Sequence, residues 1–140
     1  MSQDKVITMP SKEDYTKWEY NGHEYHLDFA DVETVEKYET VIDQMAEDEK
    51  NVMKTGKTSE ILKSYCSIYY NFFDRIFGEG SGKDILGEKI NASVCHVAYM
   101  DFLGFVANQR KGIQSYQNEI RSKYGNRASR RAAQKKKGKN

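Results

Sequence analysis

The sequence is poor in the residues that build disulfide frameworks and metal sites. Its 140 residues include only two cysteines, Cys66 and Cys95, in no Cys-x-x-Cys pair, and three histidines. We expect both thiols to be reduced and buried, because each lies in an apolar helical pattern. His23 and His26 are three residues apart on a predicted strand and would point to opposite faces of it. The sequence therefore predicts no disulfide, no metal site and no cofactor.

Long apolar runs are also missing. No stretch approaches the roughly 18 apolar residues of a membrane-spanning helix, and the opening Met-Ser-Gln-Asp-Lys-Val holds no signal-peptide core. With 38% hydrophobic and 31% charged residues, the composition is typical of a folded, water-soluble domain. We expect a protein that stays in the cytoplasm where it is made and that has no membrane partner.

The net charge of +1 conceals an uneven distribution along the chain. Residues 121–140 contain nine Lys or Arg and no acidic residue. Removing these nine from the 22 basic residues leaves 13, against 21 acidic residues, in residues 1–120, a net charge of −8. Residues 126–140 have almost no apolar side chain to bury, which predicts a disordered basic C-terminal tail.

Two different patterns open the chain. Residues 1–16 are polar, contain the only proline, Pro10, and show no period, so we predict a flexible N-terminal arm. Over about residues 17–29, aromatic and polar residues alternate around Asn21-Gly22, a dipeptide that supplies the positive φ angles of a type I′ turn. An isolated hairpin is only marginally stable. We therefore expect its larger side chains to fasten it to a helical body: Trp18, Tyr20, Tyr25 and Leu27.

Apolar residues spaced three and four apart predict about three helices after the hairpin. Asp31 can cap the first helix, Thr58 or Ser59 the second, and Asn91 the third. The predicted inner faces are Val32, Val35, Tyr38, Ile42, Met45 and Val52; then Ile61, Leu62, Tyr65, Cys66, Tyr69, Phe72, Phe73, Ile76 and Phe77; then Val94, Cys95, Ala98, Phe102, Phe105 and Val106, with a continuation through Ile113, Tyr116, Ile120 and Tyr124.

Glycines separate the predicted helices. The Gly78–Gly82 cluster ends the second helix, a short turn through Ile85, Leu86 and Gly87 follows, and Gly125 ends the folded part. The sequence thus predicts a mainly α fold, in which an N-terminal β-hairpin packs on a compact bundle of about three helices. This hairpin and helical domain spans residues 17–125.

No catalytic arrangement emerges from the residues. The segment Gly78-Glu79-Gly80-Ser81-Gly82-Lys83-Asp84 resembles a phosphate-binding loop, but Phe77 stands at the first glycine position, Asp84 replaces Ser or Thr, and a helix precedes it. The carboxylates crowd a predicted exposed helix face instead of an apolar setting that would raise the pKa of one of them. Cys66 and His96 could meet across two helices, but nothing nearby would activate the thiol. We predict that the protein is not an enzyme.

Two features suggest binding to another macromolecule. The second predicted helix carries a wide aromatic stripe, which is either ordinary core or, in part, a groove for another helix or for self-association. A basic tail can bind nucleic-acid phosphates or dock on an acidic protein. The acidic body would repel phosphates, which makes nucleic acid the less favoured partner. The candidate contact residues are Tyr69, Phe73, Phe77, Gly78 and Gly80 at the end of the second helix, and Arg127, Arg130 and Arg131 in the tail.

Three stretches of the sequence carry a family resemblance. These are Trp-Glu-Tyr-Asn-Gly-His-Glu-Tyr-His-Leu-Asp-Phe with the helical Val-Glu-Thr-Val-Glu-Lys-Tyr-Glu, then Phe72-Phe73-Asp74-x-x-Phe77-Gly78-Glu79-Gly80 with Lys83, and the arginine-rich close that begins at Asn126. Together they resemble small tail assembly chaperones of bacteriophages and prophages of Gram-positive hosts, over roughly residues 17–134.

The resemblance implies a protein that binds the long helical tape measure protein and keeps it soluble until tail tube subunits replace it. The tail tube protein and further copies of the chain are then additional candidate partners. Such a protein would act in the host bacterial cytoplasm and would not remain in the mature virion. It implies no catalytic residue and no cofactor.

The alternative is a small nucleic-acid-binding or regulatory protein that acts through its basic tail. The two readings differ in their response to salt. Phosphate binding by about six cationic side chains weakens by orders of magnitude between low and moderate salt, whereas helix-in-groove binding hardly changes.

Overall fold

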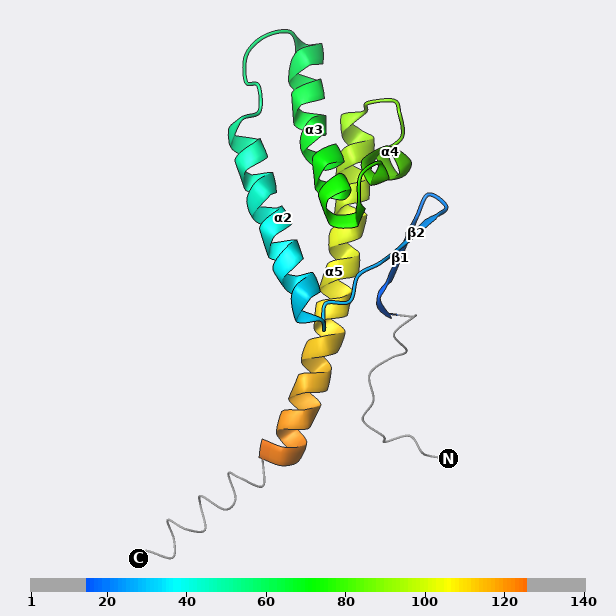
Figure 1. The fold of residues 1–140 in the computed structure, drawn as a ribbon, viewed down its shortest axis with the longest axis vertical. Coiled ribbons are helices and arrows are strands. Elements are labelled where there is room, and N and C mark those ends of the chain that lie inside the picture. Colours follow the sequence, from blue (N-terminus) through cyan, green and yellow to red (C-terminus); the bar gives the residue numbers. More distant parts are fainter. Residues whose placement is uncertain (1–14, 126–140) are drawn as a thin grey trace, which may run out of the picture.

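The computed structural model describes residues 15–125 as a helical body with one hairpin (Figure 1). The hairpin strands are β1 (Lys17–Tyr20) and β2 (His23–His26), and the helices are α2 (Val32–Lys50), α3 (Thr58–Phe77), α4 (Ser81–Leu86) and α5 (Ala92–Ile120), followed by a π-helical turn, Arg121–Gly125. The mainly α fold with an N-terminal hairpin is confirmed. The predicted basic tail, residues 126–140, and all but the last two residues of the predicted arm lie outside the described part of the chain.

The hairpin forms as its sequence predicts. Asn21 and Gly22 have φ angles of 50° and 78°, and the register sets Trp18 opposite Tyr25 and Tyr20 opposite His23. His26 is exposed on the other face, so the two hairpin histidines point apart, as expected. One boundary is wrong. Thr16, assigned to the arm, is buried, and its carbonyl accepts a hydrogen bond from the Leu27 amide at 2.8 Å.

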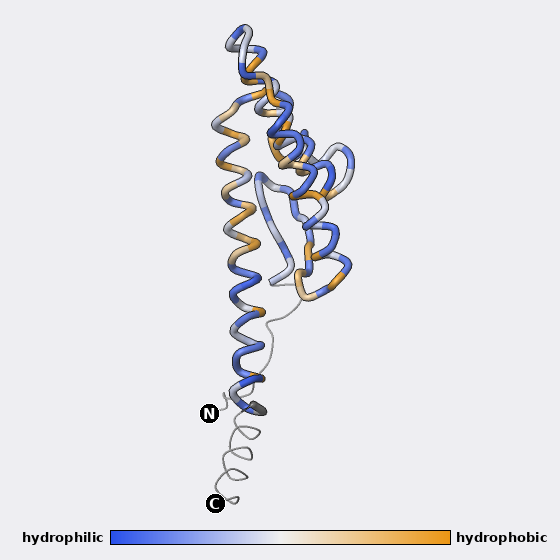
Figure 2. Tube along the Cα trace, turned by 90° about the vertical axis from the view of Figure 1, so that its left-hand side faces the viewer, coloured by the Kyte–Doolittle hydropathy of each residue, from blue (hydrophilic) through white to orange (hydrophobic). Residues whose placement is uncertain are grey.

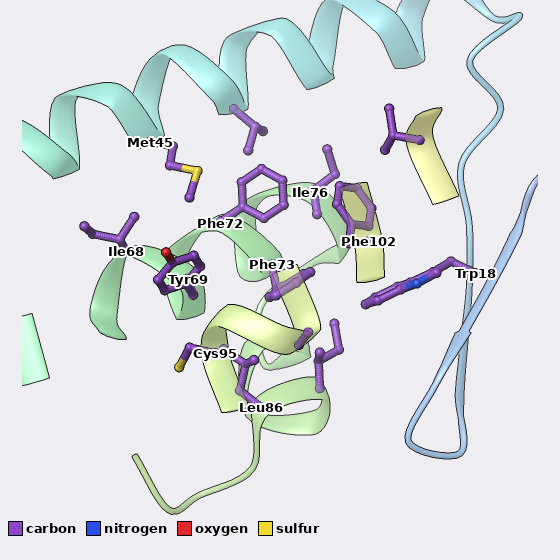
Figure 3. Packing of buried hydrophobic residues seen from close by; sticks show 14 of the residues in the cluster. Trp18, Met45, Ile68, Tyr69, Phe72, Phe73, Ile76, Leu86, Cys95 and Phe102 are labelled. Atoms are coloured by element: carbon purple, nitrogen blue, oxygen red, sulfur yellow. The ribbon is translucent and has the colours of Figure 1, made fainter. Parts of the chain in front are cut away.

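Trp18 fastens the hairpin to the helices. Its ring stacks on Phe73 of α3 at 5.7 Å and meets the ring of Phe102 of α5 edge-on at 5.3 Å. Its indole Nε1 donates to Asp101 Oδ1 at 2.8 Å, so the buried polar atom is satisfied. Figure 3 shows Trp18 reaching from the hairpin toward Phe73 and Phe102, with Met45 of α2 and Cys95 of α5 approaching from other sides. The hairpin therefore closes one side of a single core.

The core residues come from every element of the body. The buried side chains are Trp18, Leu27, Phe29, Val41, Met45, Cys66, Ile68, Tyr69, Phe72, Phe73, Ile76, Ile85, Leu86, Cys95, Ala98, Phe102 and Val106. Five residues predicted for the inner faces are exposed instead, by 36% to 69%: Val32, Leu62, Tyr65, Val94 and Ile120. Each keeps the helical period of apolar residues, but the neighbouring elements leave its side chain uncovered. Val41 and Ile68, which the prediction left out, are buried.

The helix ends test the capping predictions. Asn91 caps α5 as expected, because its Oδ1 accepts from the amides of Ser93 and Val94 at 2.9 and 3.2 Å. Asp31 occupies the N-cap position of α2 but makes no capping hydrogen bond. The predicted caps of α3 are wrong, since the helix begins at Thr58 with Lys57 at its N-cap. The segment expected as a short turn through Ile85 and Leu86 is the helix α4.

α5 extends well beyond the other helices and the hairpin. Figures 1 and 2 show it running along one side of the other elements and then continuing past them. The half of α5 beside the body is largely apolar, whereas the projecting half is largely polar (Figure 2).

Candidate functional site

The glycine-rich segment after α3 satisfies its own backbone groups. Gly78, with φ 114°, ends the helix and donates its amide to the Asp74 carbonyl at 2.9 Å. The Asp74 side chain then accepts the amide of Gly82 at 2.7 Å. An anion at this turn would face the Asp74 carboxylate and compete with it for that amide. The segment is therefore built as a turn between two helices, in agreement with its interpretation from the sequence.

The same segment braces the body. A Cβ atom on Gly82 would stand 2.7 Å from the Tyr70 carbonyl oxygen, so only glycine lets α4 approach α3 this closely. The Tyr70 hydroxyl donates to the Gly87 carbonyl at 2.6 Å, and the side-chain Nδ2 of Asn21 donates to the Ile85 carbonyl at 3.3 Å. These contacts tie α3, α4 and the hairpin tip together.

The aromatic residues expected at a partner surface lie mostly in the core. Tyr69 is 7% and Phe73 is 0% exposed, so neither offers an anchor to a partner in this fold. Burial, followed by the hydrogen bond to Tyr65, raises the pKa of the Tyr69 hydroxyl. Phe77 is half-buried, with its ring 4.4 Å from that of Tyr25. The hairpin covers the Phe73 and Phe77 end of the aromatic stripe with Trp18 and Tyr25, whereas Tyr69 packs against Tyr99 of α5.

The remaining predicted contact residues fall into two groups. Gly78 and Gly80 are exposed but, as glycines, present only backbone, and both have positive φ. Arg127, Arg130 and Arg131 lie outside the described residues. The structure therefore does not bring the predicted set together at one surface.

Cys66 and His96, which the sequence could bring together, differ in their burial. Cys66 and Cys95 are both buried, and burial, followed by a hydrogen bond with Cys66, raises the pKa of Cys95 to about 12. His96 is exposed, so it does not meet the buried Cys66. Residues 15–125 contain no group of three or more His, Cys, Asp or Glu side chains that could hold a metal ion.

The acidic residues of α2 divide between the surface and the helix interface. Five acidic side chains of α2 are exposed, as predicted for its outer face: Glu36, Glu39, Asp43, Glu47 and Glu49. Asp48 instead accepts a hydrogen bond from the Arg75 guanidinium at 2.8 Å and so links α2 to α3. This ion pair was not predicted, because it joins residues 27 positions apart.

A mostly apolar surface, beside the single charged residue Asp101, lies on α5. Val94, Val97 and Met100 are 37%, 56% and 51% exposed, and they are followed by exposed Gly104 and Ala107. These five residues form what we name the α5 apolar face. At about 1.5 Å per residue, it extends for roughly 20 Å along the helix. A Cβ atom on Gly104 would meet nothing within 4 Å, so another chain can approach the backbone closely there.

The α5 apolar face adjoins a hollow of about 500 Å³ between α5 and the segment that leads into the hairpin. It is lined by Tyr15, Lys17, Asp101, Gly104, Phe105, Asn108 and Gln109. Sequence reasoning missed this face, since it placed Val94 inside and passed over Val97 and Met100. The available signal was the composition of residues 92–108, in which Asp101 is the only charged residue.

No helix in residues 15–125 has the length and apolar character that crossing a membrane requires.

Residues 21–135 match a family model, and the chain belongs to this family, DUF6673, which is described as a family of unknown function. The matched range covers the helical body and most of the basic end, but begins after β1. No curated protein and no solved structure matches the chain.

Proposed function

We propose that the protein is a non-catalytic binding protein that uses the α5 apolar face to cover an apolar helix stripe of another protein. The observation that carries this proposal is the exposure of Val97 and Met100, 56% and 51%, at neighbouring positions on one helix face. Side chains three and four apart lie together on a helix, so these residues and Gly104 form a continuous strip. A strip of this kind is typical of helix-in-groove and helix-on-helix recognition.

We further propose that the partner is the tape measure protein of a phage tail, in keeping with the family resemblance of the hairpin and the Phe72–Gly80 segment. A tape measure protein is a long helical chain whose apolar faces are uncovered before the tube forms. Each copy of this chain offers only a few exposed apolar side chains, worth about 25 cal/mol per Å² buried. The affinity per copy is then modest, and coating by many copies supplies the avidity while still permitting release.

This function places the protein in the host bacterial cytoplasm during assembly and outside the finished virion. Tail tube subunits would displace it as the tube grows. Catalysis has no part in the proposal, and no cofactor is required.

Co-expression with the tape measure protein tests the proposal. The double variant Val97→Glu, Met100→Glu puts charge on the α5 apolar face at exposed positions, where its effect on folding should stay within about 0.5 kcal/mol. We expect the tape measure protein to become insoluble while the unfolding midpoint of the variant itself is unchanged. The matched control is Val32→Glu, which adds charge at an exposed valine of α2 and should preserve solubility.

Two outcomes would contradict the proposal. Full solubility with the double variant would exclude the α5 apolar face. Failure of the unaltered protein to bind the tape measure protein, together with DNA binding that falls by orders of magnitude as salt rises, would favour the nucleic-acid alternative.

A further inference from the structure

The buried stripe of α5 continues beyond the body. Phe102, Val106 and Gln109 are at most 4% exposed, whereas Ile113 and Tyr116 are half-buried and Ile120 is 36% exposed. Their spacing alternates between four and three residues, which is the pattern of a coiled-coil seam. The same side of α5 is thus core at one end and increasingly uncovered at the other.

The apolar stripe of α5 loses its packing partners where the helix extends past the other elements. Figures 1 and 2 show the C-terminal half of α5 projecting past the start of α2. A hollow of about 410 Å³ opens at this junction, lined by Phe29, Val35, Arg110, Ile113, Gln114 and Gln117. An isolated helix of this length is marginally stable in water unless its apolar face is packed. Ile120 is 36% exposed and is not one of the partly buried side chains that pack against the core, so the seam has room for a second helix that begins in the hollow.

Arg110 and Arg121 lie to one side of this seam at 100° per residue, whereas Lys111 lies on the opposite side of α5. Between Arg110 and Lys123 the chain has four basic residues and one acidic residue, Glu119, and residues 126–140 add seven basic residues and no acidic one. A second copy paired along the seam would bring like charges together, which disfavours it. A nucleic acid would match the charge but would offer no apolar ridge to Ile113 and Ile120. An acidic amphipathic helix satisfies both the seam and its flanks.

We infer that the α5 end, residues Arg110–Lys123, binds an acidic amphipathic helix of a partner protein. The apolar residues of that helix pack on Ile113, Tyr116 and Ile120, and its Asp or Glu side chains face Arg110 and Arg121. At 100° per residue, Ile113 lies on the opposite side of α5 from Val97. The α5 end is therefore a second surface, and the inference does not depend on the partner proposed for the α5 apolar face.

A designed peptide provides the probe. A peptide about three heptads long, with Leu at seam positions and Glu at the flanks, repels itself at neutral pH and stays monomeric. We expect this peptide to gain helicity on adding the protein and to bind at least about tenfold more tightly than a peptide with Lys in place of Glu. Replacing Ile113 and Ile120 by Ser should weaken binding about tenfold or more. Arg110→Gln with Arg121→Gln should reduce the ratio between the affinities for the acidic peptide and for the Lys peptide.

Controls keep the inference falsifiable. Val97→Glu with Met100→Glu should leave peptide binding unchanged, and the single variant Ile120→Ser removes the most exposed seam residue with little risk to folding. The inference is overturned if the acidic peptide does not bind, or if both peptides bind equally. It is also overturned if sedimentation shows a dimer that Ile120→Ser dissociates, or if duplex DNA binds while the acidic peptide does not. None of these outcomes bears on the co-expression experiment, so the two proposals fail separately.

Discussion

The corner where the hairpin, α3 and α4 meet and the projecting end of α5 are built on opposite principles. At the corner, Trp18, Phe73 and Phe102 are nearly or fully buried, and hydrogen bonds join residues far apart in the chain, such as Trp18 and Asp101. At the α5 end, the apolar seam becomes steadily more exposed, from half-buried Ile113 to Ile120, which is 36% exposed. The contrast teaches that the fold closes its core completely on one side and leaves apolar helical surface exposed on the other.

The largest expected difference between the two regions comes from truncating aromatic and aliphatic side chains. Phe102 is fully buried among the rings of Trp18, Phe72 and Phe73. Phe102→Ala should lower the free energy of unfolding by about 3–5 kcal/mol, because it creates a cavity among packed rings. Ile120→Ala should change it by less than about 1 kcal/mol. Urea unfolding of both variants measures the difference, and equal losses would contradict the division into a closed core and an open helix end.

A buried polar link between α5 and the hairpin should give the next largest effect. Gln109 Oε1 accepts the Phe29 amide, and its Nε2 donates to the Leu27 carbonyl at 2.9 Å. Gln109→Leu leaves both backbone groups buried without partners, so we expect a loss of about 2–4 kcal/mol.

Hydrogen–deuterium exchange of the Gln109→Leu variant, followed at the backbone amides around Leu27 and Phe29, should show where the stability is lost. The matched control is Gln117→Leu, which lies on the exposed half of the same helix. Unchanged stability of the Gln109 variant would show that this link is dispensable.

Two glycines compare the close packing between α3 and α4 with the open space on the α5 apolar face. Gly82→Ala forces a Cβ atom against the Tyr70 backbone, at 2.7 Å from its carbonyl oxygen, and should cost about 1–3 kcal/mol as α4 shifts from α3. Gly104→Ala meets open space within a helix and should instead stabilise the protein by about 0.5–1 kcal/mol. Thermal unfolding compares the two. Opposite signs are expected, and equal signs would mean that α4 is not held by close approach.

Alkaline pH should weaken the core with a smaller, gradual effect. Burial raises the pKa of Cys95 from 9.0 to about 12 and that of Tyr99 from 10.0 to about 12. A raised pKa means that the folded state keeps these protons while the unfolded state releases them. Their contribution to stability is therefore complete below about pH 9 and is lost as pH rises toward 12. Urea unfolding should show a loss on the order of 1 kcal/mol between pH 8 and 10, and a flat profile would contradict it.

Local signals were sufficient for several parts of the fold. Asn21-Gly22 specified the hairpin turn, because only residues tolerant of positive φ suit a type I′ turn. Asn91 specified the start of α5, and Gly78 specified the end of α3, because each satisfies backbone groups within a few residues. The period of apolar residues located the long helices for the same reason, since it depends only on neighbours along the chain.

The sequence by itself therefore determined the types of the hairpin and the long helices, the hairpin turn, the glycine stop after α3 and the basic character of the C-terminal end. Only the tertiary structure decided which side of each apolar stripe became interior. Phe73 is buried because Trp18 of a hairpin about 50 residues earlier in the chain stacks on it, and Tyr69 because it packs against Tyr99 of α5. Val97 and Met100 are exposed because no element of the described chain covers their side of α5. Burial depends on contacts between distant residues, and the helical period carries no information about which distant element arrives.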